Sequence, residues 1–263
     1  MKVVLFCGGL GTRLRDYDEN LPKPMATIGY RPIMWHLMKY YAHYGHKDFV
    51  LCLGYRADVI KQYFLNYNEA LSNDFILAGG GSQVQLLNSD IHDWRITFVD
   101  TGPTTPIGER MRLVRRHVEG EEMFLANYSD CLTDLPLNTF LDRFRATSCT
   151  AGFISVAPSQ SFHYVAATDG LVTSLTDVRA TPLRVNGGFF AFRPEIFDYM
   201  EPGEELVDAP FHRLIEKKQL MAYEYNGFWQ AMDTFKDKQQ LDGMNAKGSP
   251  PWEVWRRKGH ANA

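Results

Sequence analysis

Residues 3–7 read Val3-Val4-Leu5-Phe6-Cys7, an unbroken apolar run that stops at Gly8-Gly9. A run without polar alternation is typical of a strand that is buried on both faces, as the strands of parallel sheets are. Three later segments have the same character and end in glycine or polar residues: 49–53 (FVLCL), 96–99 (ITFV) and 123–126 (MFLA). We expect all four segments to be strands of a parallel sheet.

Segments with helical spacing lie between these runs. Apolar residues at Ile33, Met34, Leu37, Met38 and Tyr41 predict a helix over 33–44, and residues 58–67 predict a second one. Alternating strands and helices predict an α/β fold with a doubly wound, mostly parallel sheet. Such sheets bind ligands beyond the carboxyl ends of their strands, so the residues that end these strands are the candidates for function.

The second half of the chain has a less regular pattern. Residues 150–156 and 188–192 predict two more strands, and residues 211–220 predict a helix. Gly79-Gly80-Gly81 predicts a loop at the tip of a hairpin that continues into 83–87. The stretch 227–263 is rich in Trp, Gly, Pro and charge, and we expect it to pack on the core as a helical tail.

Composition is that of an ordinary globular protein. The 263 residues are 45% hydrophobic and 22% charged, which excludes collagen-like, coiled-coil and disordered classes and suits one large or two small domains. With a net charge of −3 the chain has no overall basic surface for nucleic acid, so a local cationic pocket must hold any anionic ligand. The four cysteines have no metal-site spacing and are expected to be reduced thiols. The apolar run at the N-terminus is too short for a signal peptide or a membrane span, so we expect a cytoplasmic protein without a membrane partner.

The glycine-rich turn after the first strand, Gly8-Gly9-Leu10-Gly11-Thr12-Arg13, offers backbone amides that can bind phosphate. It is not a dinucleotide fingerprint, because Leu14 replaces the third glycine, and not a Walker A loop, because no Lys-Ser/Thr follows. An ordinary strand-to-helix turn stays open as an alternative. Lys23 stands between two prolines, which stiffen the backbone around it. With Arg13 it predicts a concentrated cationic site, although a solvated loop lysine is the alternative.

Two aspartates and a glycine pair complete the candidate site. Asp130 follows the strand at 123–126, and Asp233 lies in the tail. Mg²⁺ takes one or two carboxylates together with phosphate oxygens, so this pair is a candidate metal site. Asp134 competes with Asp130 for the role, and each aspartate alone could equally be a cap or turn residue. Asn186-Gly187-Gly188 predicts a tight turn that could bind sugar hydroxyls.

Together these motifs resemble the sugar-phosphate nucleotidyltransferase family, whose signature is Gly-Gly-x-Gly-Thr-Arg-Leu followed by Pro-Lys-Pro. Both parts stand in this chain, as GGLGTRL at 8–14 and LPKPM at 21–25. The resemblance extends over nearly the whole chain. Within the family the chain looks most like the glucose-1-phosphate cytidylyltransferases, through stretches such as VNGGFFAF (185–192) and GFWQAMDTFKDK (227–238).

The resemblance implies a Rossmann-like fold and a Mg²⁺-dependent attack of a sugar 1-phosphate on an NTP, with CTP and α-D-glucose 1-phosphate as the best expectation. It implies that Arg13 and Lys23 bind the phosphates and that Asp130 and Asp233 share the metal. The residues it implies for nucleotide binding are Gly8, Gly9, Gly11, Thr12, Gly108 and Arg110. It also implies a nucleotide half over about 1–130, a sugar half over about 131–226, and a homo-oligomer.

Three positions depart from the family pattern. The glycines on either side of the metal aspartate are Ser129 and Cys131, and a Gly-Gly-Arg near the base is Gly108-Glu109-Arg110. The sugar-site Glu-Lys-Pro is Asp177-Val178-Arg179, so the lysine is missing. We expect Arg179, with Asp177, to take its place at the sugar phosphate beside Asn186 and Gly187, with Arg184 as the rival. Three alternatives therefore stay open: UTP or dTTP as the nucleotide, another sugar 1-phosphate, and a weakly active regulatory homologue that binds nucleotide sugars.

Overall fold

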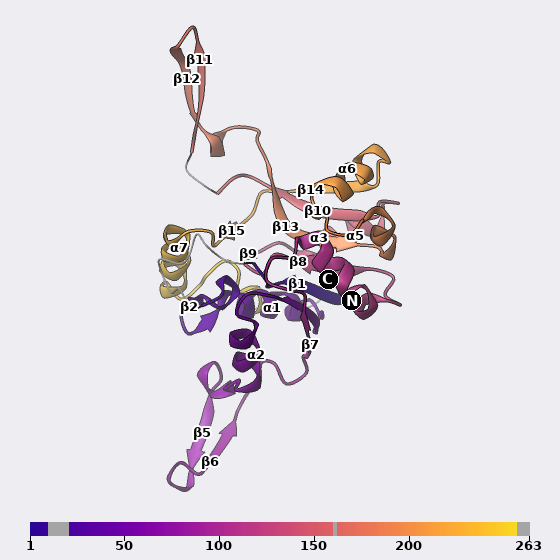
Figure 1. Cartoon of the computed structure of the whole chain (residues 1–263). Helices are drawn as coiled ribbons and strands as arrows, with labels where there is room; N and C mark the ends of the chain where they lie inside the picture. Colours follow the sequence, from indigo (N-terminus) through magenta and orange to yellow (C-terminus); the bar gives the residue numbers. More distant parts are fainter. Residues whose placement is uncertain (10–20, 160–161, 257–263) are drawn as a thin grey trace.

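The computed structural model describes residues 1–9, 21–159 and 162–256, and in them a seven-stranded sheet forms the centre of the molecule. Its strands are β1 (Lys2–Phe6), β4 (Asp48–Leu53), β7 (Arg95–Asp100), β8 (Phe124–Asn127), β10 (Ala151–Val156), β13 (Val185–Phe192) and β14 (Leu220–Tyr225). They lie in the order β14-β10-β13-β8-β1-β4-β7 (Figure 1). Neighbouring strands are parallel except where β13 meets β10 and β8, so the predicted, mostly parallel sheet is confirmed.

The first strand of the chain lies in the interior of this sheet. β1 pairs with β4 on one side and β8 on the other, and Val3, Val4 and Leu5 are completely buried. Alternate side chains enter two separate cores, Val3 and Leu5 on one face and Val4 and Phe6 on the other. Because both faces are covered, the strand is apolar from Val3 to Phe6, and only Lys2 at its start is polar. The parallel strands β1 and β8 end at the same edge, which brings Gly8 near the residues that follow β8.

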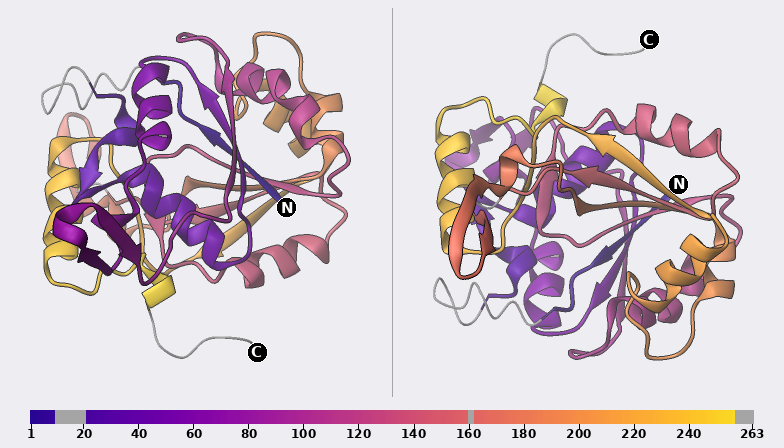
Figure 2. Two further views of the ribbon diagram at one scale, coloured as in Figure 1. Left: turned by 90° about the horizontal axis from the view of Figure 1, so that it is seen from below. Right: turned by 90° about the horizontal axis from the view of Figure 1, so that it is seen from above.

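Helices cover both faces of the sheet (Figure 2). The core that contains Val3 also contains side chains of α1 (Ile33–His43), α2 (Ala57–Leu65), α5 (Leu137–Arg145) and α7 (Phe235–Ala246). The core that contains Val4 contains side chains of α3 (Ile107–Leu113), α4 (Arg115–Val118) and α6 (Ala209–Glu216). This is the predicted doubly wound α/β fold. The helices predicted at 33–44 and 58–67 are confirmed to within two residues at each end.

Two predicted elements are wrong in detail. The helix expected over 211–220 ends at Glu216, because Lys218 adopts a φ of 56° and turns the chain into β14. Asn186-Gly187-Gly188 is no tight turn but lies inside β13, at an irregularity in its pairing with β10. Gly188 has a φ of 74°, and a side chain there would collide with the ring of Tyr128. The glycines therefore serve a bulged strand that passes close to an aromatic ring.

Within the described ranges, four two-stranded sheets complete the fold. β2 (Thr27–Ile28) pairs with β3 (Arg31–Pro32), and β9 (Cys131–Thr133) pairs with β15 (Trp229–Ala231). β5 (Phe75–Ala78) and β6 (Gln83–Leu86) form a hairpin with Gly79–Gly81 at its tip, as predicted. β11 (His163–Thr168) and β12 (Leu171–Asp177) form a second hairpin, and the two project from opposite ends of the molecule (Figure 1). Short 3₁₀ helices are η2 (Lys23–Met25), η3 (Glu69–Leu71), η4 (Gly79–Gly81), η5 (Val178–Ala180), η6 (Pro194–Tyr199) and η7 (Val254–Arg256).

The C-terminal segment packs against α1. Trp252 is completely buried, and its indole nitrogen donates a hydrogen bond to His36 Nδ1 over 3.3 Å. α7 begins with a capping box in which Thr234 and Asp237 exchange hydrogen bonds, and this fixes the backbone directly after Asp233. None of the helices in the described ranges has the length and apolar character that a membrane span requires.

Candidate active site

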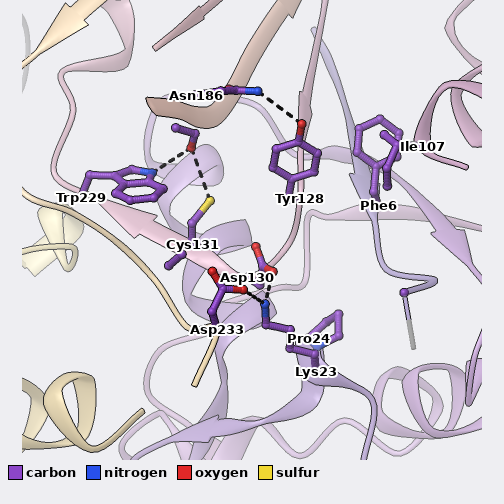
Figure 3. Close-up of a pocket in the computed structure, with 13 residues that line it drawn as sticks. Phe6, Lys23, Pro24, Ile107, Tyr128, Asp130, Cys131, Asn186, Trp229 and Asp233 are labelled. Atoms are coloured by element: carbon purple, nitrogen blue, oxygen red, sulfur yellow. Dashed lines mark hydrogen bonds and ion pairs between the residues drawn. The ribbon is translucent and has the colours of Figure 1, made fainter. Parts of the chain in front are cut away.

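A cavity of about 340 Å³ opens beyond the carboxyl ends of β1 and β8, where the fold predicts a ligand (Figure 3). It reaches from Gly9, just after β1, to the start of β13 and to the segment around β15. The residues that line it are Phe6, Gly9, Lys23, Pro24, Ile107, Tyr128, Asp130, Cys131, Asn186, Gly187, Trp229, Ala231 and Asp233.

Three charged residues meet on one wall of this cavity. The Lys23 Nζ atom donates to Asp130 Oδ2 and to Asp233 Oδ1, each over 2.6 Å (Figure 3). The two carboxylates lie side by side because β9 and β15 pair with Cys131 opposite Ala231, and the Met232 amide donates to the Asp130 carbonyl. The structure thus brings together three of the residues that the sequence proposed for catalysis.

The backbone around Lys23 is held firmly. Pro24 stands in the first turn of η2, the Met25 amide donates to the Pro22 carbonyl, and Pro24 and Met25 are buried. The Lys23 side chain is only 15% exposed, against 21% for Asp130 and 24% for Asp233. The alternative of a solvated loop lysine is therefore wrong: this lysine is enclosed and doubly paired.

Burial and pairing act on the protonation of this cluster in opposite directions. Burial lowers the pKa of the Lys23 ammonium, but its interactions with Asp130 and Asp233 outweigh burial and leave the pKa above its ordinary value. Burial raises the pKa of the Asp130 carboxyl, and Lys23 offsets only part of that rise. Burial also raises the pKa of the Cys131 thiol well above its ordinary range, so this cysteine is no thiolate nucleophile.

The two carboxylates suit a divalent cation whose remaining ligands would be phosphate oxygens of the substrate. Asp130 and Asp233 direct one oxygen each toward a single cationic position, which the Lys23 ammonium occupies. Two carboxylates together with phosphate oxygens are a typical Mg²⁺ environment. Among the described residues, no cluster of three or more His, Cys, Asp or Glu side chains could hold a metal ion by itself. Asp134, the rival of Asp130, faces elsewhere: it accepts hydrogen bonds from the Tyr225 hydroxyl and the Phe228 amide.

Gly8, which follows β1, lies against a buried arginine. Arg110 is 2% exposed, and its guanidinium donates to the Gly8 and Leu53 carbonyls and to Thr101 Oγ1. A side chain at Gly8 would overlap this guanidinium, so the glycine is required by close packing. Arg110 therefore ties together the carboxyl ends of the strands. Its predicted contact with the nucleotide stays a prediction.

The other residues predicted to bind the nucleotide divide into three groups. Gly9 lines the cavity. Gly108 does not, and a side chain on it would collide with the Glu204 carbonyl; its neighbour Ile107 lines the cavity instead. Gly11, Thr12 and Arg13 lie outside the described residues.

On the sugar side, two predicted residues line the cavity. Asn186 Nδ2 donates to the Tyr128 hydroxyl over 3.3 Å, and the Trp229 indole donates to the Gly187 carbonyl over 2.8 Å (Figure 3). These contacts fix two aromatic side chains, Tyr128 and Trp229, in the lining of the cavity. Neither aromatic residue was predicted as part of the site, because a single Tyr or Trp in a sequence is more often a core residue. The one available signal was position: Tyr128 stands two residues before Asp130, and Trp229 four before Asp233.

The structure does not bring Asp177 and Arg179 to this cavity. Arg179 Nε donates to Asp177 Oδ1 over 2.9 Å, and the pair lies at the foot of the β11–β12 hairpin with half of the arginine side chain exposed. The arginine holds the pKa of the Asp177 carboxyl below its ordinary range. Arg184, the rival cation, donates to Ser155, to the Tyr225 carbonyl and to Asn226, and so anchors the start of β13.

Comparisons with known proteins agree with this architecture. A family model described as nucleotidyl transferase matches residues 2–237. The chain is 36% identical over 257 residues to a glucose-1-phosphate cytidylyltransferase of Salmonella typhimurium, an alignment that covers 97% of this chain and 100% of that protein. A probable glucose-1-phosphate cytidylyltransferase of Bacillus subtilis is 34% identical over 257 residues, with the same coverage.

Two solved structures share the fold. A UDP-glucose pyrophosphorylase complexed with UDP-glucose matches with a TM-score of 0.68 and 15% identity, covering 94% of this chain and 98% of the other. A putative glucose-1-phosphate thymidylyltransferase from Bacillus anthracis matches with a TM-score of 0.67 and 15% identity, covering 92% and 94%. From its motifs, its fold and these matches, the chain belongs to the nucleotidyl transferase family.

Proposed function

We propose that this protein is a sugar-1-phosphate nucleotidyltransferase that joins an NTP and a hexose 1-phosphate to give an NDP-sugar and pyrophosphate. The observation that carries the proposal is the convergence of Lys23, Asp130 and Asp233 on one wall of a cavity that Gly9 also lines. The substrates we propose are CTP and α-D-glucose 1-phosphate, because near-full-length relatives at 34–36% identity are named for that reaction.

The reaction needs charge neutralisation more than proton transfer. The second pKa of a phosphate monoester is about 6, so a sugar 1-phosphate is largely dianionic at neutral pH and attacks the α-phosphorus of the NTP without a general base. This agrees with a cavity in whose described lining no histidine stands. The leaving pyrophosphate carries the displaced electron pair away, and fixed positive charge stabilises it.

The residues divide this work among them. We propose that the Lys23 ammonium binds phosphate oxygens and that the amide of Gly9 helps to hold the nucleotide phosphates. Asp130 and Asp233 would hold Mg²⁺, whose chemistry when bound is to neutralise charge on the phosphates. Since Lys23 pairs with both carboxylates here, cation binding requires it to release at least one of them.

Selection of the sugar involves other residues of the cavity lining. We propose that Asn186, Gly187, Tyr128 and Trp229 contact the sugar, whose rings and hydroxyls suit an aromatic and amide lining. The nucleotide half over about 1–130 and the sugar half over about 131–226, a cytoplasmic location and a homo-oligomer are parts of the same proposal.

Pyrophosphate release tests the proposal. The purified protein is assayed with each of CTP, UTP, dTTP and GTP, with and without glucose 1-phosphate and other hexose 1-phosphates, with and without Mg²⁺. We expect release only when a sugar phosphate and Mg²⁺ are both present, fastest with CTP, and none from Asp130→Asn. Fastest release with UTP or dTTP would correct the nucleotide. A folded protein that binds nucleotide sugars but releases no pyrophosphate with any pair would make it a regulatory homologue.

A further inference from the structure

The Arg184 side chain joins the three strands that lie side by side at one end of the central sheet. Its Nε atom donates to Ser155 Oγ over 3.0 Å, and its Nη1 atom donates to Asn226 Oδ1 over 2.9 Å. Its Nη2 atom donates to the carbonyls of Ser155 and Tyr225. Ser155 belongs to β10, Arg184 stands directly before β13, and Tyr225 ends β14, so one guanidinium cross-links all three strands (Figure 1).

Two of the segments that Arg184 joins run on into the lining of the cavity. Asn186 and Gly187 follow Arg184 on β13 and line the cavity. Trp229, three residues after Asn226, lines it as well. The Trp229 indole donates to the Gly187 carbonyl over 2.8 Å (Figure 3). The two segments are therefore bonded to each other twice, through Arg184 at one end and through Trp229 at the other.

Side-chain hydrogen bonds are needed here because the sheet is irregular at this place. The register of β13 against β10 shifts between Phe153 and Ser155, so the ladder of backbone hydrogen bonds is interrupted after Asn186. Residues 226–228 form the connection between β14 and β15. The four bonds of Arg184 thus fix the backbone next to the cavity where the strand pairing does not.

The same bonds argue against a direct contact between Arg184 and the sugar phosphate. A guanidinium has five N–H donors, and the four hydrogen bonds of Arg184 use all but one of them. A bidentate phosphate contact takes two N–H groups, so it would break at least one of these bonds. Arg184 also lies outside the cavity lining.

We propose that Arg184 is a positioning residue for the sugar side of the cavity, an inference that rests on the proposed function. Arg184 acts through the backbone of Asn186 and Gly187 and through Trp229, and it does not touch substrate. The sugar 1-phosphate then meets a wall whose shape depends on this arginine.

Loss of Arg184 should act on one substrate only. The Lys23 cluster is held separately, because β15 pairs with β9 and the Met232 amide donates to the Asp130 carbonyl. We therefore expect the KM for the sugar 1-phosphate to rise, while the KM for the NTP and kcat stay nearly unchanged.

Substitution of both ends of one hydrogen bond tests this inference. The variants are Arg184→Ala, Arg184→Lys, Asn226→Ala and the double alanine variant, with Arg145→Ala, which removes an exposed arginine at the end of α5, as the control. Saturation curves give both KM values, and calorimetry gives the Kd for CTP and for CDP-glucose. Circular dichroism and Tm verify folding. Asn226 is exposed, so its variant tests the same bond even if the Arg184 variants do not fold.

We expect Arg184→Ala to raise the KM for the sugar 1-phosphate at least about tenfold and the KM for the NTP less than about twofold. Arg184→Lys should behave like Arg184→Ala, because one ammonium cannot reproduce the four bonds of the planar fork. Asn226→Ala should raise the same KM about threefold and add little to Arg184→Ala, because both changes remove the same bond. Arg145→Ala should change neither KM.

An unchanged KM for the sugar 1-phosphate in Arg184→Ala overturns the inference. So does rescue by Arg184→Lys beside a harmless Asn226→Ala, which would mean that the charge of this residue binds the phosphate directly. Calorimetry separates these outcomes from failure of the proposed reaction. A wild type that binds CDP-glucose without releasing pyrophosphate refutes the reaction, yet a Kd for CDP-glucose at least about tenfold higher in Arg184→Ala would still support the positioning role, and an equal Kd would overturn it.

Discussion

Two charged clusters of this molecule are built in opposite ways. Around the cavity, Lys23 meets Asp130 and Asp233 across 107 and 210 residues of chain, and all three side chains are at least three-quarters buried. At the foot of the β11–β12 hairpin, Arg179 pairs with Asp177 only two residues away, and the arginine side chain is 53% exposed. The first cluster forms only when the chain folds, and removing one of its buried charges leaves the others unpaired at a large cost in free energy. The second is an ion pair between near neighbours in the sequence, and losing it costs little.

Removing one carboxylate should break the long-range cluster most severely. We expect Asp130→Asn and Asp233→Asn each to lower kcat/KM by at least about 10³-fold, roughly 4 kcal/mol, because each change removes a charge from the proposed cation site. Asp134→Asn is the control, since Asp134 bonds to Tyr225 and Phe228 and does not line the cavity. Steady-state rates at saturating Mg²⁺ measure the effect. A fatal Asp134→Asn beside a harmless Asp130→Asn would mean that the wrong carboxylate has been assigned.

Removing the ammonium group of Lys23 should have the next largest effect on the reaction rate. Lys23→Ala should lower kcat/KM by about 10²–10³-fold, roughly 3–4 kcal/mol, because a preorganised phosphate contact is lost. Lys61→Ala, at an exposed position of α2, is the matched control and should leave the rate unchanged. The assignment of Lys23 to the phosphates fails if the folded variant keeps more than about half of the wild-type kcat/KM.

The backbone conformation of Ser129, directly before Asp130, can be tested through the stability of the protein. Ser129 is buried and has a φ of 71°, a left-handed conformation that suits glycine. Ser129→Gly should keep activity and change the free energy of unfolding by less than about 1 kcal/mol, because relief of strain is offset by a more flexible unfolded chain. Ser129→Val should lose about 2 kcal/mol, since a β-branched side chain tolerates this conformation poorly. Urea unfolding measures the free energy of unfolding of both variants. If Ser129→Val were as stable as Ser129→Gly, the backbone at this position would be able to leave the left-handed conformation without cost.

Breaking the ion pair of Arg179 and Asp177 should have the smallest effect on the reaction. Because Arg179 lies outside the cavity in partnership with Asp177, we expect Arg179→Ala to change the KM for sugar 1-phosphate by less than about threefold. Asn186→Ala, which alters the cavity lining, should raise that KM more than it raises the KM for the NTP. Saturation curves for both substrates measure the two effects. A rise above about tenfold for Arg179→Ala would show that this segment reaches the sugar phosphate during the reaction, as the sequence predicted.

The features that could be predicted from the sequence are those with a local signal in the chain. Runs such as Val3–Cys7 indicate their strands because a strand that is buried on both faces must be apolar throughout. Lys23 and Asp130 could be singled out by their local settings, two flanking prolines for the lysine and a strand end for the aspartate, whereas the role of Asp233 came from the family resemblance.

The features that could not be predicted depend on distant partners. Arg110 fills the space beside Gly8 from more than a hundred residues away, and nothing near it in the sequence indicates that contact. The β11–β12 strands were not predicted because their apolar side chains stay exposed within this chain, and the extra residue opposite Ala166-Ala167 disturbs their alternation. Asn186-Gly187-Gly188 has the composition of a turn, and only the ring of Tyr128 shows why glycine is needed inside a strand.

The separation of Lys23 and Asp233 along the chain also has a consequence for biosynthesis. Proteins are synthesised at about 5–20 residues per second, so Asp233 emerges roughly 10–40 s after Lys23. Once Asp100 has been synthesised, the β1–β4–β7 part of the sheet has all its residues, while β15, which precedes Asp233, does not yet exist. A nascent chain therefore has Gly8, Gly9 and Lys23 long before it has both of the carboxylates that pair with this lysine.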